Sequence, residues 1–217
     1  MLLRARVSVL DRPGSLLGMA KAIADLGGNI VDIEVLATAD DHVVDDLIVD
    51  LPNNQPDLLT KELASAGAEV LNLRKTVQVT GQRGDLDLLA RVAAEPINAM
   101  PTFVSLAPSL WCADWAAIAT PEAGATPLHA TPGAPKPLPA GMPEPLGPLP
   151  RRGTAQCPNG ATYEVVSVQW GRHYLYLGRA DGPMFLQVEL VHLRRVVELA
   201  NVIASAAQNY SAASLSS

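Results

Sequence analysis

The segment Asp11-Arg12-Pro13-Gly14-Ser15-Leu16 combines residue types that can bind a small charged molecule. Proline fixes φ and removes an amide donor, and glycine permits close backbone approach, so the chain is expected to turn sharply here before a helix. The backbone N–H groups of Gly14, Ser15 and Leu16 open that helix, lack partners within it, and can donate to a carboxylate. The carboxylate of Asp11 can accept hydrogen bonds from an ammonium group. The loop therefore offers a partner for each charge of a zwitterionic amino acid.

The same loop residues also fit a purely structural role. A side-chain oxygen of Asp11 or Ser15 can cap the first turn of the helix, and Gly14 can serve only to turn the chain. The residues by themselves leave capping and ligand binding both open.

Residues that commonly carry catalysis or bind metals show no pattern in this chain. Four histidines, at positions 42, 129, 173 and 192, share no ligand spacing with each other or with a cysteine, so we expect surface or interface histidines and no metal site. No nucleophile elbow or phosphate-binding glycine loop is present in the sequence. The sequence predicts no catalytic residue and no cofactor, and an enzyme with an unrecognised pocket in the second half is the alternative.

The two cysteines and the aromatic residues of the second half have both a chemical and a structural interpretation. Cys112 and Cys157 lie far apart and outside any CxxC pattern, which favours free thiols in a reducing, cytoplasmic compartment. A buried strand is predicted over 111–119, and a thiol inside it would be inert. Trp170, Tyr174 and Tyr176 near Arg172 can line a small pocket, but aromatics at strand spacing also suit a core or a dimer surface.

Hydrophobic periodicity predicts the elements that position the loop. Apolar residues alternate with polar ones over 3–9, as in a strand with one buried face, and recur every three or four residues over 16–26, as in a helix ended by Gly27-Gly28. The next predicted elements are two strands, a helix and a strand, at 29–36, 42–51, 58–63 and 70–79. This βαββαβ order predicts a ferredoxin-like α+β unit, an antiparallel sheet with two helices on one face. Because Asp45 and Asp46 are adjacent, one of them is expected at the sheet edge or at a bulge.

Three parts of residues 1–79 resemble the ACT domain family in its DRPG variety: residues 7–16 with the Asp-Arg-Pro-Gly loop, Gly28-Asn29-Ile30, and the segment 45–49. In that family, paired domains bind an amino acid at their interface, between the first loop and the start of the second strand. The resemblance implies a regulatory, non-catalytic amino-acid-binding protein. The binding residues that follow from the loop and the resemblance are Asp11, Arg12, Pro13, Gly14, Ser15, Leu16, Asn29 and Ile30.

A linker is predicted at 80–84 and a second α+β domain at 85–205. The expected elements are a helix, four short strands and a long amphipathic helix, at 85–92, 111–119, 128–130, 164–168, 174–178 and 184–204. The polar face of the last helix, which includes Glu189, is expected to face water. With Trp111 to Ala117 and Gly182-Pro183, this order resembles the GAF family of sensor domains in its actinobacterial form. That resemblance implies an antiparallel sheet with flanking helices that pair between subunits.

Two segments are expected to add little to the core. Eight prolines between Pro132 and Pro150 exclude a helix or central strand, so 131–150 is predicted to be a semi-rigid insertion over the second domain, with a polyproline ligand as the alternative. Deleting 134–149 should then leave the fold intact. The tail at 206–217 is predicted to be flexible.

Composition excludes several classes of protein. The 217 residues are 48% hydrophobic and 18% charged with a net charge of −6, which indicates folded domains and no nucleic-acid partner. No apolar run reaches the ~20 residues of a membrane span. Open sheet edges and the apolar stripe of the last helix predict a homodimer or a higher even oligomer, and a structural dimer scaffold without ligand is a third possible function.

Overall fold

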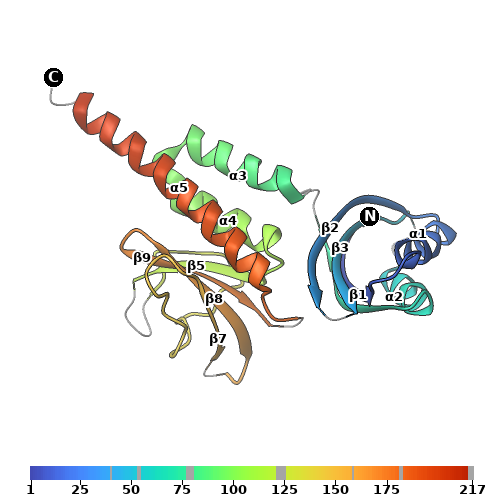
Figure 1. Ribbon diagram of the computed structural model, residues 1–217. Helices are drawn as coiled ribbons and strands as arrows, with labels where there is room; N and C mark the ends of the chain where they lie inside the picture. Colours follow the sequence, from blue (N-terminus) through green and yellow to red (C-terminus); the bar gives the residue numbers. More distant parts are fainter. Residues whose placement is uncertain are drawn as a thin grey trace. The chain divides into compact units, whose positions relative to one another are not determined.

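The chain forms two compact units, Met1–Gly81 and Gln82–Ser217, in a computed structural model (Figure 1). Each unit combines helices with one antiparallel sheet, so the predicted α+β class is confirmed. The structure describes residues 1–39, 41–52, 55–76, 81–120, 126–157, 159–180 and 183–214.

The first unit follows the order βαββαβ over its described residues. Its elements are β1 (Leu2–Leu10), α1 (Ser15–Asp25), β2 (Asn29–Ala39), β3 (His42–Asp50), α2 (Pro56–Ser65) and β4 (Ala68–Lys75). The strands lie in the sheet order β2-β3-β1-β4, and every pairing is antiparallel. Residues 77–80, which include the predicted end of the last strand, lie outside the described residues.

One face of this sheet is covered by α1 and α2, which lie on the same side of it in Figure 1. The alternating residues of β1 face these helices and are buried, as the period of two predicts. The core they form is aliphatic, and residues 1–81 contain no phenylalanine, tyrosine or tryptophan. Its buried members are Leu3, Ala5, Val7, Val9, Met19, Ile23, Leu47, Val49, Leu51, Leu59, Leu63 and Ala68.

The opposite face of the sheet carries charged side chains at its centre. Asp46 is 2% exposed and accepts hydrogen bonds from Arg6 at 2.8 and 2.9 Å and from Arg4 at 2.8 and 3.0 Å. Burial by itself raises the pKa of Asp46, but the hydrogen bonds from Arg6 and the charges of both arginines outweigh it and lower the pKa. Neither aspartate lies at a sheet edge, because β3 is paired on both sides. Asp45 lies opposite an irregularity of β2 between Val35 and Ala37, which agrees with the other alternative, a bulge.

The second unit contains a five-stranded antiparallel sheet in the order β6-β5-β9-β8-β7. Its elements are α3 (Gly81–Ala94), the 3-10 helix η1 (Pro96–Asn98), α4 (Ala99–Leu110), β5 (Trp115–Ala119), β6 (His129–Ala130), β7 (Arg151–Gln156), β8 (Thr162–Trp170), β9 (His173–Arg179) and α5 (Gln187–Ser214).

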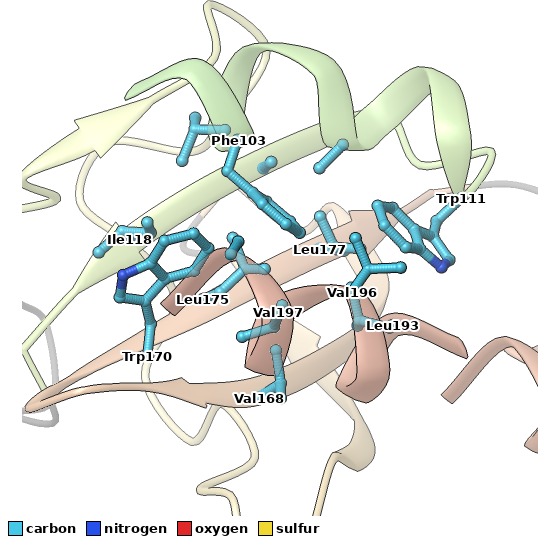
Figure 2. Close-up of a cluster of buried hydrophobic side chains, with 14 of the residues drawn as sticks. Phe103, Trp111, Ile118, Val168, Trp170, Leu175, Leu177, Leu193, Val196 and Val197 are labelled. Atoms are coloured by element: carbon cyan, nitrogen blue, oxygen red, sulfur yellow. The ribbon is translucent and has the colours of Figure 1, made fainter. Parts of the chain in front are cut away.

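Apolar side chains pack on both faces of this second sheet. On the face toward α4 and α5, Phe103 lies between Trp111 and Trp170, with ring centroids 5.9 and 4.9 Å away (Figure 2). On the other face, Trp115 packs with Tyr163 at 5.7 Å between centroids. The pairing of Trp115 with Gly178 leaves no room for a side chain, since a Cβ on Gly178 would lie 2.0 Å from the indole.

Several predicted boundaries of the second unit differ from the structure. Instead of a strand from residue 111, α4 ends at Leu110 and Trp111–Asp114 form a turn in which Cys112 has a φ of 48°. The guanidinium of Arg179 stabilises this turn by donating to the carbonyls of Trp111 and Cys112 at 2.8 and 3.0 Å. The interpretation of Cys112 as a strand residue was therefore wrong.

Two helices are longer than their sequence patterns indicate. α3 already begins at Gly81, within the predicted linker, because first-turn residues need no intrahelical N–H partner and Leu88 and Val92 hold the helix on the core. α5 continues to Ser214, through most of the segment predicted as a flexible tail, which is rich in alanine, the best helix former. The strand β7 was not predicted, since only Ala155 of it is buried and the alternation is weak.

Glu189 does not face water as expected. It is 6% exposed, accepts a hydrogen bond from Arg179 at 3.2 Å and from the backbone N–H of Leu186 at 2.8 Å, and so ties the start of α5 to β9. A buried cation on β9 requires a partner, and that requirement overrides the helical pattern.

The proline-rich segment contributes to the core, contrary to the expectation that it adds little. Leu138 is 2% exposed and Ala134 is 6% exposed, and both belong to the apolar cluster around Trp115. The segment therefore covers the second face of the sheet, and its deletion is no longer expected to leave the fold intact.

Candidate functional site

The predicted binding loop connects β1 to α1 and is exposed. Gly14 is the N-cap residue of α1 with φ 95° and ψ −9°, a left-handed conformation that other residues adopt at a cost. A Cβ on Gly14 would meet no atom within 4 Å, so open space lies above this residue. Asp11, Arg12, Pro13 and Leu16 are exposed as well.

Hydrogen bonds of Ser15 hold the loop in shape. Its hydroxyl donates to the Leu10 carbonyl at 2.8 Å and its N–H donates to the Arg12 carbonyl at 3.2 Å. The N–H of Ser15 is therefore engaged, contrary to the expectation that it points to a ligand. No side chain caps α1, so the capping role considered for Asp11 or Ser15 is absent. First-turn N–H groups such as those of Leu16 and Leu17 have no acceptor within the helix.

Two predicted site residues lie at the other end of the sheet. Asn29 pairs with Asp50, which pairs with Leu2, whereas Leu10 next to the loop pairs with His42. Ile30 follows Asn29 on β2 and pairs with Val49. Within one chain, the fold therefore does not bring Asn29 and Ile30 to the loop at 11–16. A strand of this length, at about 3.3 Å per residue, separates the two groups by more than 20 Å.

Asp45 is a candidate residue that sequence reasoning missed. It pairs with Val7 on the helix-covered face, is 7% exposed, and its Oδ1 atom is buried without a hydrogen-bond partner. Burial, the adjacent charge of Asp46 and the charge of Asp11 raise the pKa of Asp45. Val7, the partner of Asp45, lies three residues before Leu10, so Asp45 belongs to the half of the sheet that carries the loop. Its adjacency to Asp46 was the only signal in the sequence.

The described residues contain no group of three or more histidine, cysteine or acidic side chains placed to hold a metal ion. His192 is hydrogen-bonded to Asp85, and His42 is exposed. Cys112 and Cys157 form no disulfide in the described part of the chain, and burial raises the pKa of Cys157. No helix in the described part of the chain is both long and apolar enough to cross a membrane.

Comparison with known proteins gives distant structural neighbours only. No protein-family model and no curated protein matches the chain. An ACT domain protein from Streptococcus pneumoniae matches with 22% sequence identity over 34% of this chain and 88% of that chain, at a TM-score of 0.29. An unknown protein from Galdieria sulphuraria matches with 16% identity over 91% of both chains, at a TM-score of 0.32. Such TM-scores do not establish a shared fold.

Proposed function

We propose that the chain is a non-catalytic regulatory protein of the cytoplasm whose first unit, a ferredoxin-like domain of the ACT type, binds an amino acid. The observation that carries this proposal is the exposed loop at 11–16, which opens α1 with a left-handed glycine and no side-chain cap. A ligand carboxylate finds the first-turn N–H groups and the positive end of the helix dipole there. The free space over Gly14 admits such a ligand.

The ammonium group of the ligand finds negative charge beside the loop. Asp11 is exposed, and Asp45 adds a second carboxylate whose buried Oδ1 lacks a partner. Burial, and then the charges of Asp46 and Asp11, raise the pKa of Asp45, and a cation bound there would favour its charged form. Charge complementarity thus supports a zwitterion more than a simple anion.

The register of the sheet supports binding between two copies of the chain. β2 is an edge strand of the first unit, and pairing it antiparallel with β2 of a second copy places Asn29 of one copy near the Ala39 end of the other. The Ala39 end is the end of the sheet that carries the loop. Val31, Ile33 and Val35 on this strand are 38%, 37% and 64% exposed, which suits burial in such a homodimer.

The second unit is proposed to support the assembly. By its resemblance to GAF-like sensor domains, its helices would pair between subunits, and α5 exposes Leu199 and Val202 at 52% and 65%. This role needs no catalytic group.

A thermal-shift screen of the full chain against the twenty amino acids tests the binding. Ligand that binds only the folded state raises stability by about 2.7 kcal/mol at one hundred times its Kd. An amino acid that raises the melting temperature would be taken to isothermal titration. If all twenty leave the melting temperature unchanged at millimolar concentration, the scaffold interpretation replaces the proposal.

Variants of Gly14 locate the site. Gly14→Val should abolish binding, because a β-branched side chain fills the space over the loop and resists the φ of 95°. Gly14→Asn accepts a left-handed backbone more easily and should fold while still weakening binding. Gly160→Asn, in the second unit with φ 86°, is the matched control and should bind normally. Asp11→Asn should weaken binding by about fivefold, less than Gly14→Val.

The oligomeric state is the independent check. Light scattering at micromolar concentration should report a dimer or a higher even oligomer. A monomer that still binds an amino acid at the loop would contradict the pairing of the β2 strands, while leaving the loop as the site.

A further inference from the structure

The second unit contains a cavity of about 470 Å³ beside the turn between β8 and β9. Its walls come from five elements that are distant in the sequence: η1, the first turn of α4, β6, the β8–β9 turn and α5 near Asn201. A volume of this order suits a small organic molecule. The cavity lies entirely within the second unit and shares no residue with the loop at 11–16.

The β8–β9 turn directs two rings to the same side of the sheet. Trp170 pairs with His173 across the two-residue turn Gly171-Arg172, and Gly171 has a φ of 58°, as expected for the first position of a type II′ turn. Paired residues of antiparallel strands share a face, and Trp170 belongs to the core on the helical side. His129 on β6 pairs with Ile118, which belongs to the same core. Both imidazoles and the indole therefore line one cavity.

A buried polar atom without a partner and several further hydrogen-bonding groups line this cavity. The Nδ1 atom of His173 is buried and has no hydrogen-bond partner among the described residues. Figure 2 shows the indole nitrogen of Trp170 on the side of the ring away from Val197. Asn201 contributes an amide, and Arg172 contributes an exposed guanidinium at the turn. Each of these groups can donate a hydrogen bond.

The charge carried by the residues that line the cavity favours a negatively charged ligand. None of the lining residues is an aspartate or glutamate, although the chain as a whole carries a net charge of −6. The one permanent charge is the cation of Arg172. Pro96, Ile97 and Met100 form an apolar wall of the same cavity, and Ile97 is 83% exposed.

From this arrangement we infer that the cavity binds a small organic carboxylate with an apolar or aromatic body. The carboxylate accepts hydrogen bonds from Arg172 and His173, and the body lies against the apolar wall and the indole. A phosphate dianion fits less well, because a single exposed cation balances only part of its charge and the apolar wall is left uncovered. This site is independent of the amino-acid site proposed for the first unit.

Isothermal titration of the full chain with phenylacetate, phenylacetamide and inorganic phosphate tests the inference. Phenylacetate should bind with a Kd near or below a millimolar, and its neutral amide at least about fivefold more weakly, because the amide loses the charge-assisted bonds. Phosphate should give no saturable heat. Equal affinity for phenylacetate and phenylacetamide, or no binding of phenylacetate, would overturn the inference.

Point variants assign the binding to the cavity. Arg172→Gln should weaken phenylacetate binding by about fivefold and Asn201→Ala by about threefold, and both positions are peripheral enough to preserve the fold. Arg195→Gln, an exposed arginine of α5 outside the cavity, is the matched control and should bind normally. Gly14→Val should also leave phenylacetate binding unchanged, which separates this site from the loop. If Arg172→Gln and Asn201→Ala bind like the parent, or if Gly14→Val removes the binding, the cavity is not the site.

Discussion

The sheets of the two units differ in how their second faces are covered. In the first unit, helices cover one face and the opposite face carries the Asp46 carboxylate between two arginines. In the second unit, helices cover one face and the proline-rich segment packs Leu138 on the other. The cavity of the second unit lies on the helical side of its sheet and is lined by residues of one chain, whereas the loop at 11–16 and Asn29 of the first unit lie at opposite ends of its sheet. Under the two proposals, the site of the first unit would combine residues of two copies, and the cavity of the second unit would need only one.

The substitution expected to lower stability most, Gly178→Ala, tests the packing on the second face of the sheet in the second unit. Gly178→Ala places a methyl group against the indole of Trp115, which is 0% exposed and cannot move without disturbing its cluster. We expect the free energy of unfolding of the second unit to fall by about 4 kcal/mol, at the upper end for overpacking. Denaturant titration followed by circular dichroism measures this change.

Gly153→Ala is the matched control on the same sheet. A Cβ on Gly153 meets Pro143 at 3.5 Å, an ordinary contact, so this variant should unfold like the parent. Equal stability of the two variants would show that the second face is loosely packed and that the comparison between the units is mistaken.

Asp46→Asn tests the charged face of the first unit. The substitution leaves Arg4 and Arg6 without their carboxylate and should cost about 3 kcal/mol at pH 7, as removal of one partner from a buried ion pair does. Asp50→Asn removes a carboxylate that is 56% exposed and pairs with the N-terminus, and it should change stability little.

The stability lost in Asp46→Asn is expected to become smaller as the pH falls. Because the pKa of Asp46 is lowered from its ordinary 3.8, the stabilisation is complete above that value and is lost as the pH falls through the folded-state pKa. Unfolding titrations at pH 7 and below pH 3.8 should therefore show the cost of Asp46→Asn shrinking in acid. A cost that stays constant with pH would assign it to packing rather than charge.

Leu138→Ala tests the contribution of the proline-rich segment. Removing a side chain that is 2% exposed should cost about 2 kcal/mol, the low end for leucine because the surrounding segment can relax. Calorimetry of the variant against Leu146→Ala, whose side chain is 64% exposed, isolates the effect of burial. Equal melting temperatures for the two would mean that the segment does not belong to the core.

The smallest expected change in stability, that of Asp45→Asn, is a gain rather than a loss. The pKa of Asp45 is raised from 3.8, so its ionised form destabilises the folded unit above the folded-state pKa, and this cost disappears as the pH falls toward 3.8. Asp45→Asn should raise stability by about 1 kcal/mol at pH 7 and leave it unchanged near pH 3.5. The same variant should weaken amino-acid binding if Asp45 serves the ammonium group. A destabilised variant at pH 7 would show that its carboxylate has a favourable partner.

Local patterns predict the first unit well because its elements follow simple periods. The alternation in β1 and the glycines after α1 determine the order of elements without long-range information. The roles of Asp45 and Asp46 could not be predicted, because they depend on which strands flank β3. The resemblance to the ACT family grouped Asn29 with the loop, and only the register shows that they are separated within one chain.

The second unit was harder to predict because tertiary contacts override its local patterns. The turn at Trp111–Asp114 depends on Arg179, which is more than sixty residues away along the chain. Glu189 is buried for the same reason. Of the residues suggested to line a pocket, Trp170 and Arg172 line the cavity, whereas Tyr174 and Tyr176 pack in the cluster on the other face. His129 and His173 join the cavity only through the sheet.

The absence of aromatic residues from positions 1–81 has a spectroscopic consequence. All three tryptophans belong to the second unit, so fluorescence excited at the red edge of tryptophan absorption reports only on that unit. An amino acid that binds the loop at 11–16 will leave this emission unchanged unless the two units are energetically coupled. A fluorescence change on amino-acid binding would therefore be a direct readout of communication between them, and a silent titration with measurable heat would show that the first unit responds alone.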